Sequence, residues 1–260
     1  MLGFAGRSLA GGNALSDDSE FDPNAPTIDV GYYLNGGNCL SESETAILGD
    51  VAGMRILVSP EGTGEEVLSL LNLGADVTVL GSDFVQLQQA LDAVGKSAAT
   101  FEGGLGLSVP DELSGQQFDV IYSPWGSLDG LAAFDAWATD VATFLPLGGH
   151  LVAFDEHPVS FMVKPAGAEL AVTTSYWGEM IDEDNDGEPD VPQIGAGPTT
   201  FGWALGDLVT ALGDAGMATI RIQEFEEAGR FLSALEMLED IDDEVRSRLP
   251  SALLMVARRI

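Results

Sequence analysis

Short apolar runs alternate with amphipathic stretches along most of the chain. The first such pair is the apolar run at 54–59, followed after a Gly-containing turn by apolar positions three and four apart at 65–74. Runs of this length predict buried strands, and the three-and-four spacing predicts helices. The pattern predicts strands at 54–59, 76–81, 98–103, 118–126, 148–157, 218–226 and 251–259, and helices at 43–53, 65–74, 84–95, 128–145 and 205–216.

This alternation predicts an α/β fold. We expect a three-layer sandwich with a seven-stranded, mostly parallel sheet and helices on both faces. Sheets of this kind bind ligands in the crevice beyond the carboxyl ends of their strands. The candidate site residues are therefore those that directly follow the predicted strands, at 60–64, 81–83, 103–106, 123–126 and 155–158.

The alternation of apolar runs and amphipathic stretches is absent at two places, and these places indicate how the chain is divided. Residues 1–42 form a predicted N-terminal arm, and residues 43–260 form the main domain with an insertion at about 158–202. Tyr32 and Tyr33 lie at the end of the arm, where they either close over a pocket or simply fix the arm to the domain. The pattern leaves both alternatives open.

The charge balance excludes several classes of partner. The chain has 10 Lys and Arg against 42 Asp and Glu, a net charge of −32. Nucleic acids and anionic membrane surfaces both require a basic face, so neither is an expected partner. Surface repulsion of this size is screened by salt, which favours a salt-adapted, halophilic protein, although a merely acidic protein is the alternative.

The cellular compartment is predicted from the absence of a membrane span and of a good signal peptide in the sequence. No uninterrupted apolar run reaches the roughly 18 residues of a membrane span, and the Gly-rich N-terminal stretch makes a poor signal peptide. Cys39 is the single cysteine, which excludes an internal disulfide. We therefore expect a cytoplasmic protein.

Several blocks in this order resemble the class I S-adenosylmethionine-dependent methyltransferases. They are LGDVAGMRILVSPEGTGEEVLSLLNLGADVTVLGSD at the position of the family's first strand, glycine loop, helix and second strand; FDVIYSPWGSL at its fourth strand; and FLPLGGHLVAFDEHPV at its fifth. The resemblance covers roughly residues 40–260, apart from 158–202. It implies the methyltransferase fold, S-adenosylmethionine as cofactor and a small-molecule substrate.

The resemblance also implies where the cofactor would lie. Its contacts would come from the loop after the first strand, the end of the second strand, and the loops after the third and fourth strands. The implied cofactor-binding residues are Ser59, Glu61, Gly62, Gly64, Leu80, Gly81, Asp83, Gly104, Ser123 and Trp125.

The cofactor motifs depart from the family pattern at three places. In the first loop, Val58 stands at an acidic position and Pro60 at a glycine position, whereas Gly62 and Gly64 are kept. Gly81 stands where the family's ribose-binding acid ends the second strand. Gly103 and Gly104 replace a common aspartate that contacts the adenine amine. Asp83 and Glu61 are carboxylates that could act in place of the missing ones.

His157 is the candidate catalytic base, with Glu156 or Asp155 as the carboxylate that orients it. It follows a predicted strand at the ligand-binding edge, and its ordinary pKa of about 6.5 suits proton removal near neutral pH. The alternative is a histidine hydrogen-bonded for structural reasons. His150 begins the same strand, so we expect it at the opposite edge in a structural role.

An acidic loop at 182–190, DEDNDGEPD, has the alternating carboxylates of calcium loops. These residues would converge on a hard cation, and the glycine after them permits the required turn. Position twelve of the loop is Gln193 rather than the usual bidentate Glu, and a solvated acidic loop is the alternative. The candidate ligands of a structural calcium ion are Asp182, Asp184, Asp186 and Asp190.

Two functional hypotheses therefore remain. The first is methyl transfer from S-adenosylmethionine to a small molecule. The second is a methyltransferase fold that has lost the cofactor and serves as a binding or structural protein, or as a cofactor-independent enzyme. Because fold does not decide function, the geometry of the site must decide between them.

Overall fold

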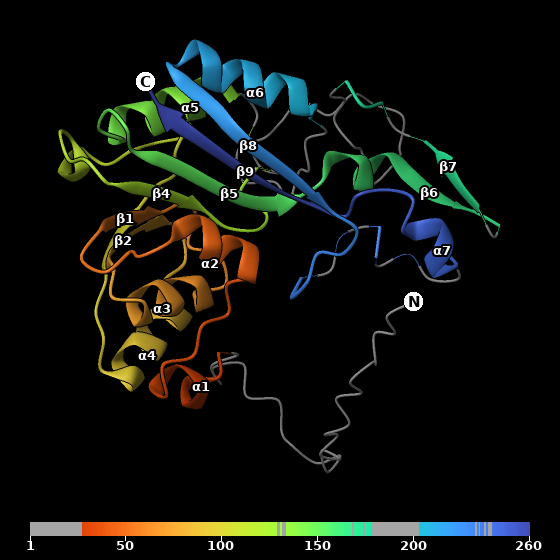
Figure 1. Ribbon diagram of the computed structural model, residues 1–260. Helices are drawn as coiled ribbons and strands as arrows, with labels where there is room; N and C mark the ends of the chain where they lie inside the picture. The colour runs from red at the N-terminus through yellow and green to blue at the C-terminus, as the bar shows by residue number, and fades with distance from the viewer. Residues whose placement is uncertain are drawn as a thin grey trace, which may run out of the picture.

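The sheet has seven strands in the spatial order β3-β2-β1-β4-β5-β9-β8 (Figure 1). The computed structural model describes residues 28–128, 131, 134–167, 169–173, 175–177, 203–231, 233, 235, 236, 238 and 241–260. The strands are β1 (Arg55–Val58), β2 (Asp76–Gly81), β3 (Ala99–Glu102), β4 (Val120–Ser123), β5 (His150–Glu156), β8 (Met217–Phe225) and β9 (Ala252–Arg259). Strands β1 to β5 pair in parallel, whereas β9 runs antiparallel to both β5 and β8.

Helices cover both faces of the sheet, which confirms the predicted three-layer α/β fold. They are α1 (Val30–Leu34), α2 (Glu42–Leu48), α3 (Glu65–Asn72), α4 (Val85–Val94), α5 (Phe134–Phe144), α6 (Leu205–Asp214) and the short α7 (Asp243–Arg246). Figure 1 shows α5 and α6 on one side of the sheet and α1 to α4 on the other.

The parallel strands are apolar on both faces because each face supports its own layer of helices. In β1, Ile56 and Val58 belong to the core beneath α3 and α4, whereas Leu57 between them belongs to the core beneath α5 and α6. All three side chains are fully buried. Successive side chains of a strand point to opposite faces, so a continuous apolar run fills both cores.

Two helices differ most from their predicted bounds. The sequence predicted a helix over 43–53, but α2 begins at Glu42 behind a capping box formed by Ser41 and Glu44, and it ends at Leu48 with Gly49, whose φ is +65°, as the C-cap. The helix expected over 128–145 begins at Phe134. Leu128 lies before it and is buried, so tertiary packing rather than helical position accounts for its apolar character.

The end of the predicted arm belongs to the core. Ile28, Tyr33 and Leu40 are buried in the core beneath α3 and α4. Asn72 on α3 donates hydrogen bonds to the carbonyl oxygens of Tyr33 and Gly37 at 3.0 and 2.7 Å. These contacts fix residues 28–40 against the domain.

The start of the predicted insertion also has defined structure. A 3₁₀ turn, η2 (Pro158–Met162), leads into the hairpin of β6 (Val163–Ala166) and β7 (Glu169–Val172). A second 3₁₀ turn, η1 (Asp111–Leu113), precedes β4. No helix in the described ranges is long and apolar enough to cross a membrane.

Candidate cofactor and substrate site

The first strand ends in a tight loop at 59–64 that leads into α3. Gly62 and Gly64 have φ of +60° and +83°, the left-handed region that favours glycine. A Cβ on Gly62 would lie 3.0 Å from the Pro124 side chain, which follows β4. The loops after β1 and β4 therefore touch, as is expected of neighbouring parallel strands.

A cavity of about 210 Å³ lies at the carboxyl ends of β1 to β4. Four of the predicted cofactor residues, Ser59, Glu61, Gly81 and Gly104, line it. Five further lining residues belong to the segments expected at the strand ends; they are Pro60, Ser82, Gly103, Leu105 and Gly126. The remaining lining residues, Leu107, Ser127, Leu131 and Trp137, were not expected from the sequence. Among these residues, only Trp137 could have been noticed in the sequence, because it occupies a position on the apolar face of a predicted helix.

The Glu61 carboxylate occupies the end of β2. Its Oε1 atom accepts hydrogen bonds from the backbone N–H of Asp83 at 2.8 Å and of Ser82 at 3.1 Å, and from the Ser82 hydroxyl at 3.2 Å. A Cβ on Gly81 would lie only 1.9 Å from Glu61 Oε2. The glycine at position 81 therefore leaves room for a carboxylate that comes from another loop.

The loop after β3 forms a second wall of the cavity. Gly103 has φ of +147°, and a Cβ there would lie 2.3 Å from the carbonyl oxygen of Ser108. The N–H of Gly106 donates to the Asp140 carboxylate on α5 at 2.8 Å. Only glycine fits at position 103, so the loss of the expected aspartate has a backbone reason.

Asp155, at the end of β5, holds the loop after β4. Its buried carboxylate accepts hydrogen bonds from the N–H groups of Gly126 at 2.7 Å and Leu128 at 2.8 Å, and from the Ser127 hydroxyl at 3.2 Å. Gly126 and Ser127 line the cavity. Asp155 thus supports one wall of the site through these hydrogen bonds. That Glu156 or Asp155 orients His157 stays a prediction.

His157 is buried, and both ring nitrogens have hydrogen-bond partners. Nδ1 accepts from the Val159 N–H at 3.2 Å, which leaves Nε2 protonated and donating to Glu224 Oε1 at 3.0 Å. Burial lowers the pKa of His157 and outweighs the opposing effect of Glu224. Glu156 is also buried. Neither residue lines the cavity at β1 to β4.

The remaining predicted cofactor residues surround the cavity without lining it. Leu80 is buried in the core beneath α5. Asp83 accepts a hydrogen bond from the Val85 N–H at the start of α4. Ser123 is buried and donates to the Ser59 carbonyl at 3.2 Å. Trp125 stacks on Phe231, with ring centroids 4.9 Å apart and planes within 13°.

A second, smaller cavity of about 160 Å³ lies toward the β8 side of the same edge. Phe154 of β5 and Phe225 of β8 supply aromatic walls, and Cys39 and Arg230 lie among its other lining residues. Phe154 also contacts Trp125, with ring centroids 5.7 Å apart. The carboxyl edge of the sheet therefore has two adjacent hollows, one near β1 to β3 and one near β5 and β8.

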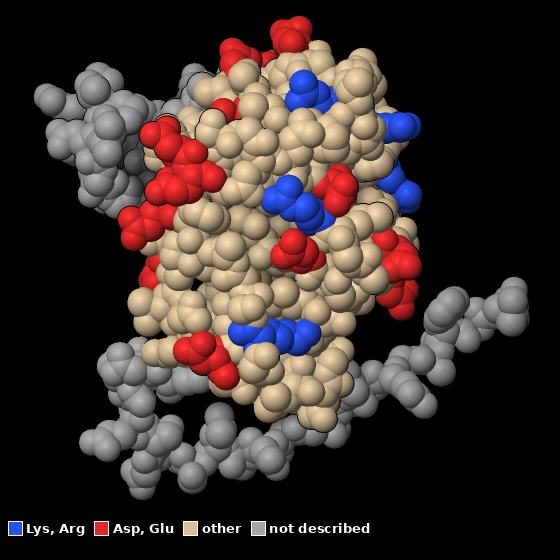
Figure 2. All heavy atoms as spheres, turned by 90° about the vertical axis from the view of Figure 1, so that its left-hand side faces the viewer, with Lys and Arg blue, Asp and Glu red and all other residues tan. Residues whose placement is uncertain are grey.

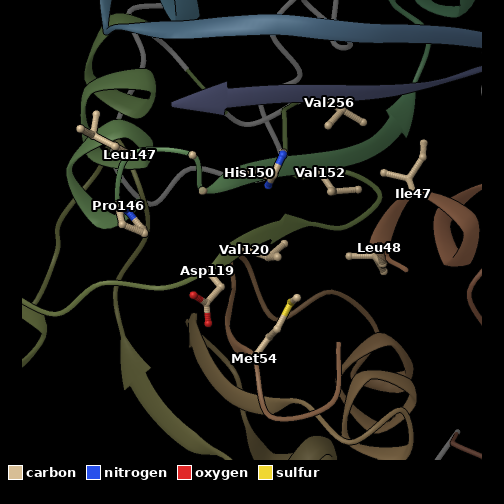
Figure 3. Close-up of a pocket in the computed structure, with 12 residues that line it drawn as sticks. Ile47, Leu48, Met54, Asp119, Val120, Pro146, Leu147, His150, Val152 and Val256 are labelled. Atoms are coloured by element: carbon tan, nitrogen blue, oxygen red, sulfur yellow. The ribbon is translucent and has the colours of Figure 1, made fainter. Parts of the chain in front are cut away.

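The opposite edge of the sheet has a different character. Figure 2 looks onto it and shows Asp and Glu as well as Lys and Arg side chains scattered over a largely uncharged surface. A cavity of about 420 Å³ lies there, and Figure 3 shows that mostly aliphatic side chains line it, together with Asp119 and His150. His150 thus lies at this edge, as expected. The convergent polar groups lie instead at the carboxyl edge, where open α/β sheets bind ligands.

The predicted calcium ligands, Asp182, Asp184, Asp186 and Asp190, lie outside the described residues. Within the described ranges, no group of three or more His, Cys, Asp or Glu side chains is arranged to hold a metal ion.

The solved structures similar to this chain include S-adenosylmethionine-dependent methyltransferases. One from Mesorhizobium loti has a TM-score of 0.61 at 21% identity, covering 84% of this chain and 96% of that one. The glycopeptide N-methyltransferase MtfA, complexed with S-adenosylmethionine, has a TM-score of 0.55 at 15% identity, covering 84% and 92%. One from Clostridium acetobutylicum has a TM-score of 0.55 at 9% identity, covering 90% and 93%.

No protein-family model matches the chain, and no curated protein matches it. The chain thus has the fold of the class I S-adenosylmethionine-dependent methyltransferases, with a sequence that has diverged far from the solved examples. This confirms the resemblance seen in the sequence at the level of the fold.

Proposed function

We propose that this protein transfers a methyl group from S-adenosylmethionine to a small molecule. The observation that carries the proposal is the Glu61 carboxylate, which lies at the end of β2 and lines the cavity there. The sequence lacks an acid at the carboxyl end of β2, where Gly81 stands, but Glu61 brings one to that strand end from the β1 loop. A carboxylate at the end of the second strand can accept hydrogen bonds from ribose hydroxyls.

The lining residues fit the nucleoside part of the cofactor. Gly103 and Gly104 present bare backbone, Leu105 and Trp137 supply apolar surface, and Glu61 supplies the acceptor. The volume of about 210 Å³ is below the roughly 300–1,000 Å³ of typical ligand pockets. We therefore assign the nucleoside to this cavity and the rest of the cofactor to the surface of the loop at 59–64.

When bound, S-adenosylmethionine supplies an electrophilic methyl group. The chain's own contribution is positioning, which can account for much of the acceleration of a two-reactant step. We assign the methyl acceptor to the cavity lined by Phe154 and Phe225. His157 lies one residue beyond β5, and because its Nδ1 lone pair accepts from the Val159 N–H, it must first give up that contact to act as a base.

Calorimetry with S-adenosylmethionine and S-adenosylhomocysteine, in about 2 M KCl to screen the surface charge, tests the proposal. We expect micromolar dissociation constants. Glu61→Gln should weaken binding about 10-fold or more, because hydrogen bonds to charged groups contribute about 1.5–3 kcal/mol. Glu102→Gln is the matched control, since Glu102 is an exposed carboxylate at the end of β3 and lies outside the cavity lining.

A swap of the carboxylate gives a sharper test. Gly81→Asp alone should impair binding, because its Cβ would collide with Glu61 Oε2. The double variant Glu61→Gly, Gly81→Asp returns the acid to β2 and should recover affinity relative to Gly81→Asp alone. The double variant Glu61→Gly, Gly81→Asn relieves the same collision without an acid, so equal recovery in the two double variants would mean that Glu61 acts only by filling space.

The second candidate function is a binding protein that has lost the cofactor. It is favoured by the small volume of the cavity and by the hydrogen bonds that already engage Glu61. A folded wild-type protein that binds neither S-adenosylmethionine nor S-adenosylhomocysteine would reject methyl transfer and leave this function.

A further inference from the structure

A buried ionic cluster lies beneath the glycine loop, and the sequence analysis did not identify it. Arg230, in the connection between β8 and β9, donates from Nη1 to Glu44 Oε2 and from Nη2 to Glu66 Oε1, both at 3.1 Å. The side chains of Glu44 and Glu66 are 0% exposed, and that of Arg230 is 20% exposed. One cation therefore serves two buried carboxylates.

Further hydrogen bonds complete the cluster. Tyr122 of β4 donates its hydroxyl proton to Glu44 Oε1 at 2.5 Å, and Arg230 Nη1 also donates to the Cys39 carbonyl at 3.0 Å. Burial opposes the charge on Arg230, but Glu44 and the other acidic groups outweigh it and raise the pKa of Arg230. Burial, together with Glu44, raises the pKa of Tyr122, so its hydroxyl remains a donor.

Glu66 connects this cluster to the glycine loop. While Oε1 faces Arg230, its other oxygen, Oε2, accepts hydrogen bonds from the Thr63 N–H at 3.2 Å and the Thr63 hydroxyl at 2.8 Å. A Cβ on Gly62 would lie 3.1 Å from the same Oε2 atom. The carboxylate of Glu66 thus touches the loop on one side and the guanidinium on the other.

Arg230 also contacts the residues that follow β4. Its guanidinium lies 4.4 Å from the centre of the Phe231 ring, and Phe231 stacks on Trp125. The same side chain therefore links the β8–β9 connection, α2, α3 and the aromatic residues beside Pro124. Pro124 in turn lies beside Gly62, since a Cβ on Gly62 would lie 3.0 Å from the Pro124 side chain.

We propose that Arg230 is a positioning residue for the cofactor loop, acting through Glu66 and Thr63 to hold residues 61–64 in their bound shape. This inference rests on the proposed function for its consequence in cofactor binding, but its structural content is independent of that function. Without the guanidinium, Glu44 and Glu66 would be two buried carboxylates with no cation between them. Such carboxylates recruit water or a proton, and either change would weaken the hold of Glu66 on Thr63.

Two measurements on the full-length protein test this proposal. The first is hydrogen exchange of the amides at 61–66, and the second is the affinity for S-adenosylmethionine. Arg230→Met should speed exchange at 61–66 about 10-fold or more and weaken binding about 10-fold. Arg230→Lys keeps the positive charge but cannot bond both carboxylates with the geometry of a guanidinium. Its exchange rate and its affinity should therefore lie between those of Arg230→Met and wild type.

Arg246→Met is the matched control. Arg246 lies in the same region of the chain, is 27% exposed, and bonds Asp243 and the Leu238 carbonyl rather than α2 or α3. It should change stability without selectively changing exchange at 61–66. If Arg230→Met does not fold, Glu66→Gln, which keeps the side-chain shape but weakens both links, replaces it with the same expected outcome.

The two possible failures are distinguishable. Wild-type protein that binds no S-adenosylmethionine would reject the proposed function, while the exchange measurement would still decide the role of Arg230. Exchange at 61–66 that matches the Arg246→Met control, in a folded Arg230 or Glu66 variant, would overturn the positioning role. Rescue of exchange by Arg230→Lys would support it.

Discussion

Replacement of Asp155 by Ala is expected to release the loop after β4 and to destabilise the protein strongly. The carboxylate is 0% exposed and accepts hydrogen bonds from three backbone N–H groups, those of Gly126, Leu128 and Glu156. Gly126 is exposed, so its N–H can return to water. Leu128 and Glu156 are buried, and their N–H groups would lose their acceptor.

The magnitude follows from these two buried donors. A buried donor left unsatisfied costs about 1–3 kcal/mol, and hydrogen bonds to a charged group contribute about 1.5–3 kcal/mol. We expect Asp155→Ala to lower the free energy of unfolding by about 4 kcal/mol. For a chain of this length, that loss corresponds to a fall of about 10 °C in Tm. Asp155→Asn keeps one acceptor oxygen and should cost about half as much.

Denaturant unfolding at constant high salt measures this effect. Asp119→Ala is the control, because Asp119 is exposed at the opposite edge and accepts from the Arg55 N–H at 2.9 Å. It should lower stability by no more than about 1 kcal/mol, since water replaces the lost acceptor. An Asp155→Ala protein that unfolds within about 1 kcal/mol of wild type would refute the argument that this carboxylate supports the loop.

Three further predictions follow from charge, burial and backbone geometry. With a net charge of −32, the Tm should rise from dilute buffer to molar KCl; a Tm independent of salt would reject the salt-adapted interpretation. Because burial lowers the pKa of His157 in the folded state, its contribution to stability is full above about pH 6.5 and is lost as the pH falls below it. His157→Gln should therefore reduce the loss of stability between about pH 6.5 and 5, and denaturant midpoints that fall equally in both proteins would contradict this. Gly103→Ala should cost at least about 2 kcal/mol, because its Cβ would lie 2.3 Å from the Ser108 carbonyl oxygen, whereas Gly115→Ala, with open space around it, should cost less; equal Tm losses would argue against the steric reason.

Much of the fold could be predicted from local pattern. The predicted strand at 76–81 has the same bounds as β2, and the predicted helix at 84–95 differs from α4 by one residue at each end. The spacing of apolar residues and the glycines that end helices are local properties of the sequence. They can therefore be read without knowing which elements pack against each other. The start of α5 was missed because Leu128 is buried in the core beneath α5 and α6 although it precedes the helix.

The candidate site could be predicted in its position but not in its contacts. The sequence identified Glu61 as a carboxylate in the first loop and Gly81 as a missing acid, but their meeting depends on the packing of β1 beside β2. Glu156 or Asp155 was expected to orient His157, which stays a prediction, whereas the hydrogen bonds between Asp155 and the loop after β4 were not expected. Side-chain direction at the end of a strand depends on the neighbouring loops, which no local pattern specifies.

The sequence by itself determined the layers of this protein: which runs are strands, which faces of the helices are apolar, and that the surface is strongly acidic. These follow from periodicity and composition, because burial of apolar surface depends mainly on which residues recur at which spacing. Only the tertiary structure decided the polar contacts. Arg230 reaches Glu66 across 164 positions of the chain, and hydrogen bonds require distances and directions that only the folded arrangement supplies.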